Sequence, residues 1–111
     1  MKMKQEDLGD DVLLVTLDGA FDIAGAGDVD LPFSVIAGSR DKVIVDFSDV
    51  SFLASIGIRV IVKTAKSMAN RGGKLMVANP NQAARKVLAS TGVDTIVGVT
   101  SSIEEARAEL A

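Results

Sequence analysis

The sequence predicts an α/β domain with a small mixed, largely parallel sheet of about five strands and about four helices. The chain has 111 residues, of which 48% are hydrophobic, enough for the core of a single domain over residues 1–111. Short apolar runs alternate with segments of helical periodicity, and the connections between them are short. Such alternation favours parallel strands joined by helices. We therefore expect the order β-β-α-β-α-β-α-β-α, with the helices crowded on one face of the sheet.

The strands are predicted from short apolar runs and the turn signals between them. A polar strand at about Met3–Asp7 is followed by the turn signal Gly9-Asp10-Asp11 and by a mostly apolar strand at Val12–Asp18. Three further apolar runs have the length of strands that are covered on at least one face. These runs are Lys42–Phe47, Lys74–Ala78 and Thr95–Val99.

The first helix is the least regular in sequence. The segment Ala24–Ser39 contains Gly25, Gly27 and Pro32, all of which disfavour a helix interior. We therefore expect a loop followed by a helix that begins near Asp30. In such a helix Pro32 lies in the first turn, where its missing N–H costs no hydrogen bond.

The second helix is predicted over Ser55–Asn70. This segment is rich in β-branched residues, but the spacing of its apolar residues is helical. Ser55 is a suitable N-cap, and Gly72-Gly73 is a suitable stop. One face is apolar and the opposite face is basic. The apolar face comprises Ile58, Ile61, Val62, Ala65, Met68 and Ala69, and the basic face comprises Arg59, Lys63 and Lys66 with Asn70.

Capping signals predict the last two helices. Asn79-Pro80-Asn81-Gln82 offers a cap, a proline at the first helical position and a side-chain amide at the third. This helix is expected to end at Gly92, because glycine is a common C-cap. Ser101-Ser102-Ile103-Glu104 has the pattern of a capping box for a final helix through Leu110.

The composition argues against most enzymes. The chain has no Cys and no His, which removes thiol nucleophiles, the most common general base and most zinc sites. It has no Trp or Tyr and a net charge of −3, so nucleic acid is not an expected partner. Gly25-Ala26-Gly27 lacks the third glycine of a dinucleotide-binding loop, and Arg71-Gly72-Gly73-Lys74 leads into a strand, whereas a phosphate-binding Walker loop leads into a helix. We expect no catalytic residues, no metal and no cofactor.

The N-terminal residues predict the cellular location. No apolar stretch follows Lys2 and Lys4, so the N-terminus does not have the pattern of a signal peptide. No uninterrupted apolar run approaches the roughly 20 residues that a membrane span requires. We therefore expect a soluble, cytoplasmic protein with no membrane insertion.

Charge is distributed unevenly along the chain. Residues 5–30 carry eight acids and no base, whereas residues 59–86 carry seven bases and no acid. Such polarity is typical of a surface that meets a charged partner, but two solvated faces that partly neutralise each other give the same pattern. Three aspartates stand near predicted strands. Asp22 follows a strand end and is typical of a turn cap, and Asp46 and Asp49 are interpreted as loop or strand-edge residues.

One segment, Val45-Asp46-Phe47-Ser48-Asp49-Val50-Ser51-Phe52-Leu53-Ala54-Ser55-Ile56-Gly57-Ile58, resembles the signature of the STAS domain family of anti-sigma factor antagonists. In that signature a strand and a short turn lead to Asp-Ser-Ser/Thr-Gly-Leu, which opens a helix. Gly19-Ala20-Phe21-Asp22 is similar to the family's Gly-Glu-hydrophobic-Asp, and the resemblance extends over the whole chain. Here Ala54 takes the place of the motif's Asp, and Ile56 that of its second Ser/Thr.

The resemblance implies a protein-interaction switch in transcription regulation. In the family, the unmodified protein binds an anti-sigma factor, commonly a serine kinase of the histidine-kinase-like ATPase superfamily, and so frees the sigma factor. The kinase phosphorylates the first Ser of the motif, and a metal-dependent Ser/Thr phosphatase reverses the step. Carried across, the phosphoacceptor is Ser55. The expected partner-binding residues are Asp22, Leu53, Ala54, Ile56, Gly57, Arg59, Lys63 and Lys66.

Two other functions are open within the same fold. A STAS domain is also found as a non-phosphorylated accessory subunit of ATP-binding-cassette lipid transporters, where it docks on the ATPase. A constitutive binding module is the third possibility. An enzyme of phosphoryl transfer is disfavoured, because the sequence offers no base, metal set or phosphate loop.

Overall fold

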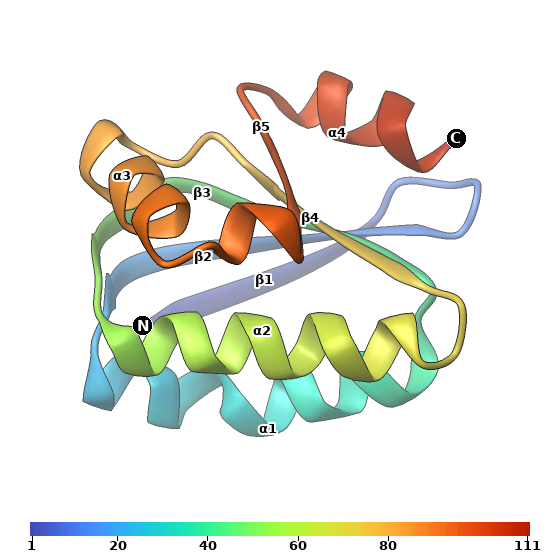
Figure 1. The fold of residues 1–111 in the computed structure, drawn as a ribbon. Coiled ribbons are helices and arrows are strands. Elements are labelled where there is room, and N and C mark those ends of the chain that lie inside the picture. The colour runs from blue at the N-terminus through green and yellow to red at the C-terminus, as the bar shows by residue number, and fades with distance from the viewer.

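A five-stranded sheet with the order β1-β2-β3-β4-β5 forms the centre of the computed structural model, which describes residues 1–111 (Figure 1). β1 is antiparallel to β2, and every other neighbouring pair is parallel. The predicted fold class and the order of its elements are thus confirmed. The strands are β1 Lys2–Asp7, β2 Val12–Phe21, β3 Lys42–Leu53, β4 Lys74–Ala78 and β5 Gly98–Thr100.

Helices cover both faces of the sheet, which corrects the expectation that they crowd on one face. α1 and α2 lie side by side on one face, and α4 lies on the other (Figure 1). None of the helices has the length and hydrophobicity of a membrane span. The helices are α1 Ile23–Ser39, α2 Ser55–Ala69, α3 Gln82–Ser90 and α4 Ile103–Leu110, with a short 3-10 helix, η1, at Val93–Thr95.

Two hydrophobic cores follow from the alternation of side chains along β3. Val43, Val45 and Phe47 point into the larger core, which α1, α2 and α3 complete, whereas Ile44 points into the smaller core under α4. A strand buried on both faces has a continuous apolar sequence, as the run in β3 does. The strand continues past Phe47 to Leu53, further than its apolar run predicts.

α1 begins at Ile23 instead of near Asp30, so the expected loop is wrong. The side chain of Asp22 caps the helix by accepting a hydrogen bond from the N–H of Gly25 at 2.9 Å. Gly25 is required here because a Cβ at this position would overlap the carbonyl oxygen of Ala20. Pro32 therefore lies inside the helix and not in its first turn. A good cap and a close approach to β2 outweigh the low helix propensity of these residues.

The N-caps of α3 and α4 lie later in the chain than predicted. The N-cap of α3 is Asn81, whose side chain accepts from Ala84 N–H, and Asn79 instead has a positive φ of 58°. The N-cap of α4 is Ser102, one residue later than predicted: its hydroxyl accepts from Glu105 N–H, and the Glu105 carboxylate accepts from Ser101 N–H. The last strand is likewise displaced, because η1 occupies the start of the apolar run that predicted it.

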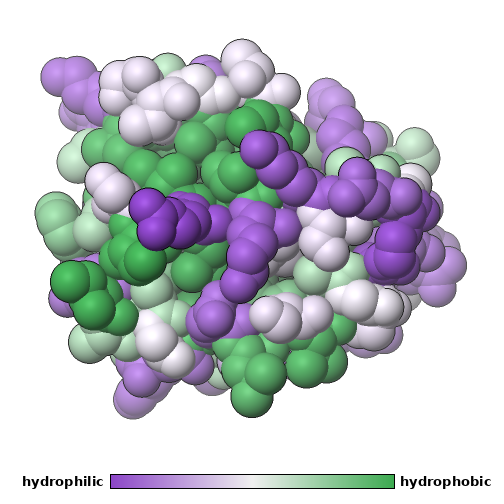
Figure 2. All heavy atoms as spheres, turned by 60° about the horizontal axis from the view of Figure 1, so that its bottom comes forward, coloured by the Kyte–Doolittle hydropathy of each residue, from purple (hydrophilic) through white to green (hydrophobic).

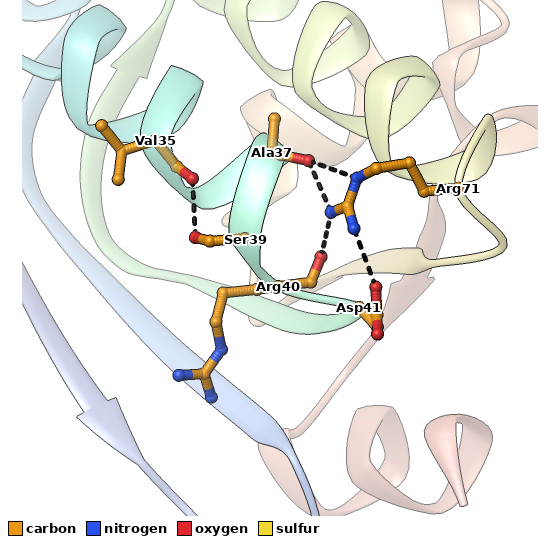
Figure 3. Close-up of polar contacts among 6 residues, drawn as sticks. All are labelled: Val35, Ala37, Ser39, Arg40, Asp41 and Arg71. Carbon is orange, nitrogen blue, oxygen red and sulfur yellow. Dashed lines mark hydrogen bonds and ion pairs between the residues drawn. The ribbon is translucent and has the colours of Figure 1, made fainter.

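The C-terminus of α1 is held by an arginine from the loop after α2 (Figure 3). The last carbonyls of a helix have no partner within it. Arg71 donates from Nε and Nη2 to the Ala37 carbonyl at 3.1 and 2.6 Å, and from Nη2 to the Arg40 carbonyl at 2.7 Å. Its Nη1 also donates to Asp41 Oδ1 at 3.1 Å. One guanidinium thus ties the end of α1 to the end of α2.

We expect Arg71→Met to lower the free energy of unfolding by about 1–3 kcal/mol, because the carbonyls lose charge-assisted donors. Arg71→Lys should restore less than half of this loss, since an ammonium cannot reproduce the planar fork of donors. Chemical denaturation measures both. Arg85→Met is the control, because Arg85 makes one long contact, 3.4 Å to Ser101 Oγ. An Arg71→Met protein as stable as this control would contradict the role given to Arg71.

Candidate functional site

The ends of β2 and β3 bring the starts of α1 and α2 to one edge of the sheet. Phe21 pairs with Leu53 in parallel register, so the residues that follow, Asp22 and Ala54, begin neighbouring helices. The N–H of Ala54 donates to the Phe21 carbonyl at 3.0 Å, which fixes the two connections to each other. This edge is the place where parallel α/β sheets present their binding groups.

The backbone of Gly57 lies against the ring of Phe21. A Cβ on Gly57 would stand 2.7 Å from Phe21 Cγ and 2.9 Å from the Phe21 carbonyl oxygen. Phe21 is fully buried and packs beside Phe47, with ring centroids 6.3 Å apart. The ring therefore has no room to retreat, and only glycine allows α2 to start where it does. Gly57 and Leu53, both expected to contact a partner, are buried.

Ser55 is exposed at the first turn of α2. The N-cap is Ala54, with no side-chain capping bond, so the prediction that Ser55 is the N-cap is wrong by one residue. The position that would accept a first-turn N–H is thus occupied by a methyl group, and the Ser55 hydroxyl makes no hydrogen bond within the chain. The first-turn N–H groups and the positive end of the helix dipole favour an anion here.

Two isoleucines, Ile23 and Ile56, line one groove beside this turn, whereas Phe52 at the end of β3 lies toward α3. Ile56 is half-buried, while Ile23 and Phe52 are 81% and 58% exposed. Neither Ile23 nor Phe52 was predicted as a site residue: Ile23 fell next to the expected loop, and Phe52 lay beyond the predicted end of its strand at Phe47. Exposure on this scale is uncommon for large apolar residues and indicates an interaction surface when they cluster.

The basic face of α2 is exposed as predicted, and one of its cations is neutralised from α1. Lys63 Nζ lies 3.2 Å from Asp30 Oδ1, with both side chains about half exposed. The solvated-face interpretation therefore accounts for Lys63. Arg59 and Lys66 form no ion pair within the chain and remain free to meet an acidic partner.

A groove runs between α1 and α2 beside this turn. Its volume is about 360 Å³, its floor is apolar and its rim is charged. The residues that line it are Ile23, Ala26, Gly27, Asp30, Ile56, Arg59, Val60 and Lys63. The groove thus joins the exposed Ile23 to the basic face of α2 in one continuous surface.

Asp46 is buried in β3, which corrects its interpretation as a loop or strand-edge residue. Its carboxylate accepts from Ser48 N–H and Ser48 Oγ, both at 3.0 Å, and from Asn79 Nδ2 at 3.2 Å. These bonds tie β3 to the connection between β4 and α3. Asp49 likewise lies within β3, paired with Asp18 of β2, but its side chain is exposed. No three residues of the types that ligate metals gather at either aspartate or elsewhere.

Comparison with known proteins places the chain among STAS domains. The family model described as "STAS domain" matches residues 4–106. A candidate anti-sigma factor antagonist of Thermotoga maritima is 34% identical over 70 residues, which cover 63% of this chain and 62%, less than two thirds, of that protein.

Solved structures of similar proteins have the same fold as this chain. The crystal structure of a candidate anti-sigma factor antagonist of Thermotoga maritima has a TM-score of 0.90 and 27% identity, covering 97% of this chain and 93% of that chain. The Bacillus protein SpoIIAA, solved in its phosphorylated form, has a TM-score of 0.77 and 20% identity, covering 99% and 100% of the two chains. At that identity the second likeness concerns the fold alone.

We expect Gly57→Ala to lower the free energy of unfolding by about 1–3 kcal/mol, because the added methyl group overlaps a buried ring and a carbonyl. The matched control is Gly27→Ala on α1, where a Cβ would meet nothing within 4 Å. There the exchange should raise stability by about 0.5–1 kcal/mol, because glycine is the poorer helix former. Denaturation midpoints of the two variants that move in the same direction would refute this account of the α2 start.

Proposed function

The chain belongs to the STAS domain family, and on this basis we propose that it is an anti-sigma factor antagonist controlled by phosphorylation of Ser55. In this proposal the unmodified chain binds an anti-sigma factor that is also a serine kinase of the histidine-kinase-like ATPase superfamily. The exposed, unbonded hydroxyl of Ser55 at the start of α2 is the observation that carries the proposal.

The proposed switch is the phosphorylation of Ser55 and its reversal. The kinase transfers the γ-phosphoryl group of ATP to Ser55 Oγ, which loses its proton, and a metal-dependent Ser/Thr phosphatase hydrolyses the ester again. A phosphate adds about −1.5 to −2 charges. The dipole of α2 and its first-turn N–H groups favour an anion at this position. The fold therefore tolerates the modification, with a stabilisation of about 0.3–1 kcal/mol.

In this proposal the anti-sigma factor cannot bind the chain when Ser55 carries a phosphate. Its surface would pack on Ile23 and Ile56, which line the groove beside the first turn of α2. Burying an unpaired dianion against such side chains is expensive. Phosphorylation thus releases the partner by electrostatic and steric exclusion, without a large change in the shape of this chain. Asp22, locked as the cap of α1, adds a fixed negative charge at the same edge.

The basic face of α2 would orient the partner. Arg59 and Lys66 form no ion pair within the chain, so an acidic patch on the anti-sigma factor would be the complementary surface. Together with the apolar residues around Ser55, they give the interface a hydrophobic centre and a charged rim, as is usual for specific complexes.

We expect Ser55→Asp to keep the melting temperature nearly unchanged and to weaken binding of the anti-sigma factor at least about tenfold, or 1.4 kcal/mol. Ser55→Ala should bind normally and resist modification. Calorimetry measures binding, and intact-mass analysis with the kinase and ATP measures modification. Phosphate on another residue, or none, would reject the switch and leave a constitutive binding module. A transporter ATPase as the partner would replace the regulatory role altogether.

We expect the double exchange Arg59→Glu and Lys66→Glu to slow association with the anti-sigma factor at low salt. The loss should shrink at about 1 M salt, where the screening length is roughly 3 Å. Stopped-flow kinetics at both salt concentrations tests this. Lys2→Glu with Lys4→Glu on β1 is the control of equal charge change. Equal slowing by the two pairs would exclude a specific basic docking face.

A further inference from the structure

β1 leaves one side of its backbone unpaired. It is the first strand in the sheet order, and it pairs with β2 alone, antiparallel and over its whole length. In such a pair every second residue directs its N–H and C=O groups away from the neighbouring strand. Outside this ladder no backbone–backbone hydrogen bond involves residues 2–7, and five of these six residues are exposed. An open edge of this kind is a template for one more strand.

α1 lies along β1 but leaves this edge free. The amino group of Met1 contacts Asp28 Oδ2 at 2.6 Å just before the start of β1. At the other end of the strand, Arg40 Nη2 contacts Asp7 Oδ2 at 3.4 Å. The helix and the strand therefore run in the same direction, with the helix on one face of the sheet and the strand at its border.

The charges along β1 are opposite in its two halves. Lys2 and Lys4 come first, and Glu6 and Asp7 follow. Lys4 and Glu6 form no ion pair within the chain, so both are available to a partner. Charged side chains on an edge strand normally keep other strands away, because like charges then meet. Two antiparallel copies of this strand bring opposite charges together instead.

One register makes full use of these charges. When Gln5 of one copy lies opposite Gln5 of the other, Lys4 lies opposite Glu6 on both sides of the two-fold axis. Side chains that are directly opposite in an antiparallel pair stand on the same face of the sheet, about 4.5–5.5 Å apart at Cβ, and interact. Moving the axis by one residue sets Lys4 opposite Lys4 or Glu6 opposite Glu6, which is unfavourable.

We propose that β1 pairs with β1 of a second copy of this chain, in the register centred on Gln5. The two sheets then join into one continuous sheet across an antiparallel, two-fold contact. Such a contact uses the same strand of both copies and therefore stops at a dimer. This inference is independent of the proposed function.

The pairing also gives a neighbour to one exposed side of α1. Val35 stands two turns after Asp28 and therefore points to the side of the helix that faces β1. It is apolar and 62% exposed. Figure 2 turns the α1 side of the molecule toward the viewer and shows apolar surface on both sides of a band of polar residues. A second copy added at β1 places its own α1 on this face of the joined sheet, beside the first.

The expected dimer is weak and reversible. Main-chain hydrogen bonds give it affinity, and the charges select the register. One strand of six residues buries less than the roughly 800 Å² per partner of a standard stable complex. The chain should therefore be monomeric when dilute and dimeric when concentrated.

Sedimentation velocity between about 10 µM and about 1 mM protein tests the proposal. The mass should rise from 11.6 kDa toward twice that value. Lys4→Glu and Glu6→Lys should each raise the dimer dissociation constant at least about tenfold, because like charges then face each other twice. The double variant should restore the dimer, because both pairs are then reversed in sign and attract again. Lys86→Glu is the control, because it makes the same charge change on α3.

Melting temperatures of the single and double variants establish that each is folded. A chain that stays monomeric up to about 1 mM overturns the proposal. A dimer that both single variants leave intact overturns it equally, because the copies would then meet through another surface. A folded double variant that remains monomeric overturns the register centred on Gln5 and, with it, the argument from charge.

Discussion

The contact between the backbone of Gly57 and the ring of Phe21 determines the geometry of the whole site. The ring ends β2 inside the core, and its carbonyl accepts the N–H of Ala54. α2 can begin only where its third residue passes this ring without a side chain. As a result the starts of both helices are fixed at one edge of the sheet. The exposure of Ser55 is therefore a consequence of core packing, not of loop flexibility.

The same edge combines two kinds of surface with separate roles. Around Ser55 the surface is apolar, and a buried interface there discriminates strongly against a phosphate. Along α2 it is basic, and it changes the rate and orientation of encounter more than the final affinity.

The element order could be predicted because periodicity, caps and turns agree along most of the chain. The start of α1 could not, because Gly25, Gly27 and Pro32 oppose a helix locally. The deciding interactions are the Asp22 cap and the contact of Gly25 with β2, and the second joins residues only after the chain has folded. Two parts of the site could be predicted: Ser55 from the family motif, and the basic face of α2 from the helical spacing of its cations. The exposure of Phe52 could not be predicted, because β3 continues to Leu53, past the end that its apolar run predicts.

If the packing of Phe21 against Gly57 is rigid, phosphorylation of Ser55 changes the structure only near Ser55. Amide NMR spectra of the chain before and after phosphorylation of Ser55 measure this most directly. Shift changes should be confined to the first turn of α2 and to the Phe21–Asp22 connection that touches it. Changes that spread through α1, β4 and the smaller core would contradict the account, because the switch would then be a change of shape and not exclusion at a fixed surface.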